Sequence, residues 1–162
     1  MSTAGIDAYI NFTNIKGESA DQAYKDWTSV RTFALELSNR VNYENQSSGL
    51  GAGIVEVSSL SAELLFDKSA ISLRQFIVKG THIDKVTLNV RRQGGKQEVW
   101  YTLVLEHALI AKSLLTYSGG LFYSSISVAF QKHKESYFSQ ESSGSKGGEV
   151  SYEWDSYTNQ GG

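Results

Sequence analysis

The sequence predicts a mostly β fold, a sandwich or a barrel, with one short helix. Apolar and polar residues alternate with period two in many segments, as in strands that bury one face. Turns that contain glycine separate several of these segments. One stretch, at about residues 69–79, has helical spacing instead. The pattern gives about seven to nine strands, the density of a sandwich or barrel.

Size and composition are those of a globular domain. The 162 residues are enough for one domain with its own core, which we expect to span residues 1–162. Hydrophobic residues make up 40% and charged residues 20%, and the formal net charge is −2. This charge does not favour a partner such as nucleic acid or an anionic membrane. Cysteine is absent, which excludes disulfides and thiolate chemistry.

The N-terminal residues give no targeting signal. Residues 1–10 lack the basic and apolar regions of a secretory signal peptide. No apolar run approaches the roughly 20 residues of a membrane span. We therefore expect no cleaved signal peptide and no membrane insertion.

The first two strands have clear alternation. At residues 6–12 one face carries Ile6, Ala8, Ile10 and Phe12. In the second strand the residues expected to face the core are Phe33, Leu35 and Leu37. The residues expected to face outward are Thr32, Ala34, Glu36 and Ser38. Taken alone, this small and polar face reads as an ordinary solvent face.

A long polar stretch, Arg40 to Gly53, follows the second strand. It is too long for a simple hairpin, so we predict a loop that projects from the body of the protein. The next strand, at residues 60–66, has its apolar positions at Leu60, Ala62, Leu64 and Phe66.

The helix has a start and a stop signal. Asp67 or Ser69 can cap its N-terminus, and Gly80 can end it in a left-handed conformation. The apolar stripe is formed by Ala70, Leu73 and Ile77. Such a helix can cover one end or edge of a barrel.

The remaining strands follow with turns between them. Their apolar positions are Val86, Leu88 and Val90, then Val99, Tyr101, Leu103 and Leu105, then Ile126, Val128 and Phe130, and finally Val150, Tyr152 and Trp154. The turns are expected at residues 93–96, 118–120 and 142–148, all of which contain glycine.

No catalytic or metal-binding pattern is visible. The three histidines, His82, His107 and His133, lack ligand spacing, and we interpret them as surface or partly buried residues. His107 follows Glu106 on a strand, so the two side chains are expected on opposite faces. Arg91 and Arg92 are interpreted as solvated strand residues. We therefore expect no enzyme and no cofactor.

The order of the elements resembles the hemolysin-coregulated proteins, Hcp, the tube subunits of the bacterial type VI secretion system. The resemblance rests on "AYINFTNIKGES" (residues 8–19), on "LFDKSA" with "VKGTHI" around the helix, on "VTLNVRRQGGKQEVWYTLVLEHALI", and on "ISVAFQKHKESYF" followed by a glycine-rich loop and "GEVSYEWD". It covers nearly the whole chain. The fold it implies is a small β-barrel of two sheets with one helix alongside, like that of phage tail tube proteins.

The resemblance implies a structural role. Family members form hexameric rings that stack into a tube, are secreted, and carry or chaperone effectors in the lumen. The implied partners are other copies of the chain, the secretion spike protein, sheath and baseplate components, and effector cargo. The protein would be made in the bacterial cytoplasm and exported without a cleaved signal peptide.

The resemblance also assigns roles to residues. The second strand of the family lines the channel, which makes Thr32, Ala34, Glu36 and Ser38 the expected lumen residues. The family's extended loop contacts neighbouring subunits or the next ring. The corresponding residues here are Asn42, Tyr43, Glu44, Asn45, Gln46, Ser47, Gly49 and Gly51.

Three other functions stay open at the level of sequence. A tail tube protein of a phage or another contractile injection particle would have the same pattern. A ligand-binding barrel needs a roomy interior, whereas the large core residues indicate a filled one. An enzyme would need a catalytic group that the sequence does not display.

Overall fold

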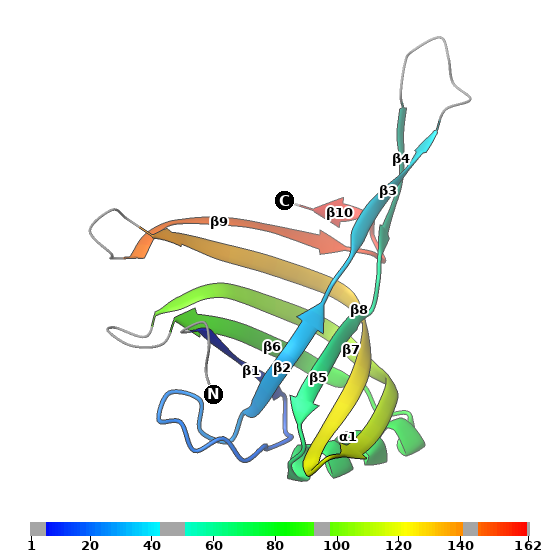
Figure 1. The fold of residues 1–162 in the computed structure, drawn as a ribbon. Coiled ribbons are helices and arrows are strands. Elements are labelled where there is room, and N and C mark those ends of the chain that lie inside the picture. The colour runs from blue at the N-terminus through cyan, green and yellow to red at the C-terminus, as the bar shows by residue number, and fades with distance from the viewer. Residues whose placement is uncertain (1–5, 43–50, 93–97, 141–145, 162) are drawn as a thin grey trace.

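The structure, a computed structural model, describes residues 6–42, 51–92, 98–140 and 146–161 (Figure 1). Within them lie ten strands and one helix. In chain order these are β1 (Ile6–Phe12), β2 (Thr28–Ala34), β3 (Leu37–Asn42), β4 (Gly51–Val57), β5 (Leu60–Leu65), α1 (Lys68–Lys79), β6 (Ile83–Arg92), β7 (Val99–Ser118), β8 (Leu121–Gln140), β9 (Lys146–Asp155) and β10 (Gln160–Gly161). The mostly β class with one helix is confirmed.

The large sheet closes on itself as a barrel. Its strand order is β10-β9-β8-β5-β2-β1-β6-β7, and β8 also pairs with β7, so the six strands from β8 to β7 form a closed ring. Neighbouring strands are antiparallel throughout. Closure removes the bare edges that six open strands would expose.

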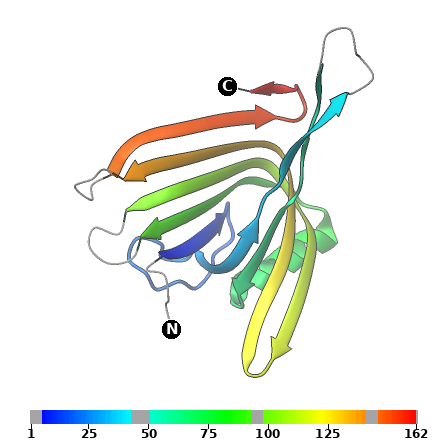
Figure 2. The same cartoon turned by 45° about the horizontal axis from the view of Figure 1, so that its top comes forward.

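The long β7–β8 hairpin belongs to two layers. Residues 123–128 of β8 pair with β5, whereas residues 132–140 pair with β9, so β8 changes its neighbour halfway. Figure 2 shows both strands bending between these halves. The predicted β-barrel is therefore confirmed, and the second sheet is the two-stranded pair of β3 and β4.

Residues from every strand of the barrel fill its interior. Ile10, Leu88, Leu103, Leu105 and Val128 are completely buried. Phe33, Leu35, Val90, Tyr101 and Phe130 are partly buried and pack against them. The predicted alternation holds in these strands because one face of each lies in this core. The core holds the strands in register and so fixes which side chains face outward.

The helix begins and ends as predicted. The side chain of Asp67 accepts a hydrogen bond from the backbone N–H of Ser69, and Gly80 has a φ of 65°. Ala70 and Leu73 are buried, and Ile77 packs against the core. The helix lies beside β7, where the guanidinium of Arg74 donates to the carbonyl oxygen of Ser113 at 3.1 Å.

The predicted second strand extends further than the observed one. β2 ends at Ala34, and Leu37 begins β3, which pairs only with β4 in a separate two-stranded sheet. Leu37 is therefore 42% exposed and does not face the core. Val150 differs in the same way: it is 71% exposed, because β9 continues beyond the barrel on the edge of β8.

Strand structure extends into two of the predicted loops. β3 reaches Asn42 and β4 begins at Gly51, so both ends of the stretch from Arg40 to Gly53 belong to strands, and residues 43–50 between them lie outside the described part of the chain. β9 begins at Lys146, inside the turn expected at residues 142–148. The turn at residues 118–120 is as predicted, since Gly119 and Gly120 both have positive φ and join β7 directly to β8.

Candidate functional site

The outward face of four adjacent strands, β2, β5, β8 and β7, is the candidate functional surface. Thr32 and Ala34 are both exposed on it, as the alternation predicts. Glu36 lies past the end of β2, where its backbone N–H donates to the Ser58 hydroxyl at 2.9 Å. Ser38 lies on β3 opposite Glu56. The structure thus brings two of the four expected channel residues onto the surface and places two outside it.

Cross-strand register builds this surface in rows. One row runs across the four strands through Ala34, Ser61, Ser127 and Lys112. The next row runs through Thr32, Glu63, Ser125 and Leu114. We call these eight residues the row face. Five of the eight are alanine, serine or threonine, so the rows leave a hollow of about 370 Å³ over the sheet.

Two β-bulges adjust the charges on this surface. The register shifts between Val30 and Thr32, so Arg31 joins Thr32 on the exposed side. A second shift, between Ile110 and Lys112, turns Lys112 outward. Arg31 lies 3.6 Å from the carboxylate of Glu63 and stacks over the Tyr123 ring at 4.8 Å. Neither bulge was predicted, because the period-two pattern of strands does not reveal an extra residue in one strand.

The β3–β4 hairpin is the second candidate surface. Figure 1 shows it projecting away from the barrel, and its two strands pair only with each other. Asn42 and Gly51 are the ends of these strands. The other expected interface residues lie outside the described part of the chain: Tyr43, Glu44, Asn45, Gln46, Ser47 and Gly49.

Residues before the hairpin tip hold its strands together. Arg40 on β3 forms an ion pair with Glu56 on β4, and its Nε donates at 3.0 Å. The amide of Gly53 donates to the side-chain oxygen of Asn39 at 2.9 Å. A Cβ at Gly53 would lie 1.2 Å from the carbonyl oxygen of Arg40, so only glycine fits there. Ile54 is nevertheless 60% exposed, which leaves an apolar side chain available on the projection.

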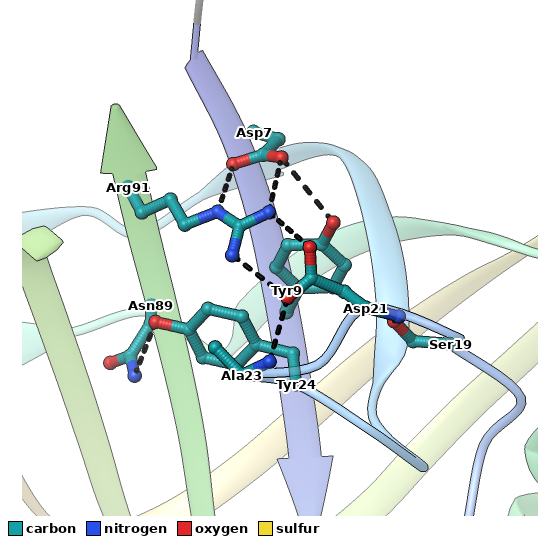
Figure 3. A network of polar contacts seen from close by, with 8 residues as sticks. All are labelled: Asp7, Tyr9, Ser19, Asp21, Ala23, Tyr24, Asn89 and Arg91. Carbon is teal, nitrogen blue, oxygen red and sulfur yellow. Dashed lines mark hydrogen bonds and ion pairs between the residues drawn. The ribbon is translucent and has the colours of Figure 1, made fainter. Parts of the chain in front are cut away.

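A buried arginine ties the loop before β2 to the barrel (Figure 3). The Arg91 side chain is 4% exposed and forms ion pairs with Asp7 on β1 and Asp21 in the loop. Its guanidinium also lies over the rings of Tyr9 and Tyr24, which stack on each other at 4.6 Å. The interpretation of Arg91 as a solvated residue was wrong, because the loop covers the outer face of β1 and β6.

Charge pairing sets the protonation of this cluster. The hydrogen bonds from Arg91 hold the pKa of Asp21 down at about 2. Asp21 in turn raises the pKa of Arg91 above its usual value. Burial raises the pKa of Tyr24. Arg91 and Asp21 therefore stay charged at neutral pH, and their ion pair holds the loop against the barrel. We interpret the members of the cluster as structural residues.

A second polar cluster joins β7, β8 and β9. Both tyrosines, Tyr101 and Tyr152, donate their hydroxyl protons to the carboxylate of Glu135. The Tyr152 oxygen lies 3.0 Å from Nε2 of His133, so it accepts the proton of that nitrogen. Burial lowers the pKa of His133, which keeps the ring neutral. His133 is only 1% exposed, so its interpretation as a surface or partly buried residue was wrong: the sheet encloses the ring completely.

The other two histidines line one surface hollow. His82 and His107 are exposed around a space of about 490 Å³. His107 has a φ of 52°, and the buried residues Leu105 and Ala108 lie on either side of it and Glu106. Glu106 and His107 therefore both lie outward, and the expectation of opposite faces was wrong. Among the described residues no three histidine, cysteine or carboxylate side chains gather in a group that would hold a metal ion.

The helix of the described chain is not long and apolar enough to cross a membrane. The candidate site is thus a pair of surfaces, a small polar sheet face and a projecting hairpin, on a closed barrel with a filled core. This combination is typical of proteins that act by binding other proteins through their surfaces.

Comparison with known proteins gives the family. The family model described as "Type VI secretion system effector, Hcp" matches residues 9–137. The chain belongs to this Hcp family. Protein hcp1 of Pseudomonas aeruginosa is 28% identical over 153 residues, which cover 92% of this chain and 94% of the relative.

Solved structures give the same fold. A type six secretion system protein has a TM-score of 0.90 at 24% identity, covering 97% of this chain and 99% of that one. Hcp1 from Salmonella typhimurium has a TM-score of 0.80 at 19% identity, with coverage of 97% and 99%. A chain of the anti-feeding prophage baseplate has a TM-score of 0.51 at 13% identity, covering 83% and 94%.

Proposed function

We propose that this protein is a structural subunit of the type VI secretion inner tube. Residues 1–162 act as one tube domain, which forms hexameric rings that stack into a tube. The tube carries effectors in its lumen and is secreted from the bacterial cytoplasm without a cleaved signal peptide. Its partners are the spike protein, the sheath and baseplate components, and the effector cargo. No catalytic step and no cofactor belong to this function.

The row face is the observation that carries this proposal. A channel wall must stay wetted and must not trap cargo permanently. Ala34, Thr32 and the serines of the two rows give small, polar side chains over four paired strands. The rows repeat once per subunit, so a closed ring would line its channel with them.

The projecting hairpin supports stacking of the rings. A two-stranded sheet gains little stability by itself in water, so a partner that covers it would add to its stability. The exposed Leu37 and Ile54 supply apolar area for that contact. In a tube the partner would be a neighbouring subunit or the next ring.

The direct test is the size of the purified protein. We expect closed rings in negative-stain micrographs and a hexamer mass by light scattering. Rings held by modest interfaces dissociate on dilution, so the mass is measured over a range of concentrations. A monomer at every concentration would contradict the proposal.

A tail tube subunit of another contractile injection particle is the second candidate. The similarity of the fold to a chain of the anti-feeding prophage baseplate favours it. Rings would form in both cases, so mass does not separate them. Gene neighbours do: a contractile sheath together with an AAA+ ATPase would favour secretion, whereas capsid or tail fibre genes would favour a phage-like particle.

A further inference from the structure

Lys112 occupies an unusual place on the row face. The bulge in β7 directs its side chain into the 370 Å³ hollow that the two rows form. It lies opposite Ser127 on β8, and its side chain is exposed. A positively charged side chain at the end of a row thus lines a hollow formed largely by small side chains.

The positive charge of Lys112 is not compensated within the described chain. Glu63, the acidic member of the rows, already lies 3.6 Å from Arg31. No ion pair to Lys112 occurs among the described residues. The local charge of Arg31, Glu63 and Lys112 together is therefore +1, although the whole chain has a net charge of −2. An acidic segment that the rest of the protein repels would be attracted here.

The hydroxyl groups around Lys112 are also unengaged. The side chains of Ser61, Ser125 and Ser127 make no hydrogen bond to any other described residue. Each hydroxyl can rotate to donate its proton to an anion. An ammonium with neighbouring hydroxyl donors is a set of groups suited to a carboxylate, and hydrogen bonds to a charged acceptor are stronger than neutral ones.

We propose that Lys112, with the hydroxyls of Ser61, Ser125 and Ser127, forms a carboxylate subsite that holds acidic segments of the cargo. That the ligand is cargo rests on the proposed function. The subsite itself is complete within one subunit. The cargo it selects is a protein surface or tail rich in aspartate and glutamate. Repetition round a ring would multiply a weak single contact into useful retention.

The experiment compares three labelled peptides of equal length, with glycine alternating with glutamate, glutamine or lysine. Fluorescence anisotropy measures their binding to the full chain at low salt. Light scattering of the same samples reports whether rings are present. We expect the glutamate peptide to bind about two- to fivefold more tightly per site than the glutamine peptide, as for an exposed ion pair. High salt should remove the difference because it screens the charges.

Variants separate this subsite from general electrostatics. Lys112→Gln should abolish the preference for glutamate, whereas Lys134→Gln should keep it. Lys134 is an exposed lysine on β8 outside the row face, so both variants lose one charge. Lys112→Glu should reverse the preference toward the lysine peptide. Ser127→Ala keeps the charge of Lys112 and should reduce the preference for the glutamate peptide. This variant tests the subsite independently if a Lys112 variant folds poorly.

The outcomes distinguish the two proposals. Equal binding of the glutamate and glutamine peptides, or equal loss in Lys112→Gln and Lys134→Gln, would overturn the subsite even in samples that contain rings. A preference that depends on Lys112 would support the subsite in rings and in monomers alike, whereas the tube function is contradicted only by a monomer at every concentration.

Discussion

At the scale of single residues, the Arg91 cluster has the most definite energetics. Removing one partner of a buried ion pair leaves the other charges uncompensated. Here Asp7 and Asp21 are 20% and 24% exposed, so water can partly replace the lost partner. Arg91→Met should therefore lower the free energy of unfolding by about 2–3 kcal/mol, below the 3–5 kcal/mol of a fully buried pair. Urea denaturation measures the difference.

The neighbouring Arg92 provides the control for this prediction. Its guanidinium lies over the Trp100 ring at 4.2 Å and bonds to Gln140 on the surface. Arg92→Met should cost about 1 kcal/mol or less, as expected for exposed contacts. Similar losses in the two variants would mean that the loop does not depend on Arg91.

The pKa of Asp21 gives a pH prediction. Its folded value of about 2 lies below its ordinary value of 3.8. A carboxyl with a depressed folded pKa adds stability above the unfolded pKa, and this contribution is lost as the pH falls toward the folded value. Asp21 should therefore make the protein less stable between about pH 4 and pH 2. Asp21→Asn should flatten the pH dependence in that window, as measured by urea midpoints at pH 5, 4, 3 and 2. An unchanged slope would count against the pairing.

These residues show where prediction from sequence reached its limit. The alternation in β1 places Tyr9 opposite the core face, and Arg91 on the neighbouring strand was interpreted as solvated. Instead the loop that carries Asp21 and Tyr24 covers it, and Tyr24 is only 5% exposed. Arg91 contacts Asp7 and Asp21, which are 84 and 70 positions away in the sequence. Contacts between such distant positions produce no periodic pattern from which they could be predicted.

At the scale of elements, two motifs that carry the family resemblance contact each other. Glu18, from "IKGES", accepts a hydrogen bond from the backbone N–H of Lys68 at 2.8 Å, and its own N–H donates to Asp67 at 3.0 Å. The Thr28 hydroxyl also donates to Asp67 at 3.1 Å. The loop thus completes the cap of α1, in the reciprocal manner of a capping box. Two segments of the chain therefore act as one structural unit.

Gly17 makes this contact possible. A Cβ there would lie 2.3 Å from the Thr28 hydroxyl oxygen and 2.6 Å from the carbonyl oxygen of Trp27. Gly17→Ala should cost about 1–3 kcal/mol of stability by overpacking, and the melting temperature should fall accordingly. Gly148→Ala is the control, because a Cβ at that position meets no atom within 4 Å. Equal melting temperatures for the two variants would show that the loop relaxes without cost.

The β3–β4 hairpin should be separable from the barrel. In the described part of the chain β3 and β4 pair with each other and with no barrel strand, so we expect deletion of residues 42–51 to leave the barrel intact. We expect the circular dichroism spectrum of a β protein and cooperative unfolding to persist, while tube growth and secretion are blocked. Electron microscopy and a secretion assay measure these effects. Normal secretion after the deletion would reduce the hairpin to a spacer.

At the scale of the whole molecule, the fold followed from local patterns but the surfaces did not. Alternation and turns predict strands that close around a core, and the helix caps predict where the helix lies. The row face depends instead on register and on two bulges, between Val30 and Thr32 and between Ile110 and Lys112, which shift side chains by one position. A shift of one residue reverses the face of a side chain, so small irregularities decide which residues line a surface.

The channel assignment leads to a prediction for Ala34. It is exposed on β2, and no core volume changes when it is replaced. The chain has no cysteine, so Ala34→Cys introduces a single thiol. In rings this thiol should react with small maleimides, and in long tubes it should be shielded from large polymer-linked maleimides, since these enter a narrow channel slowly. Lys134→Cys is the matched control, because Lys134 is exposed on β8 outside the row face. Its reaction with the large and the small maleimide shows the effect of reagent size alone. If the large reagent modifies Ala34→Cys equally fast in monomers, rings and tubes, the row face lies on the outside of the assembly, and the lumen assignment fails while the rings remain.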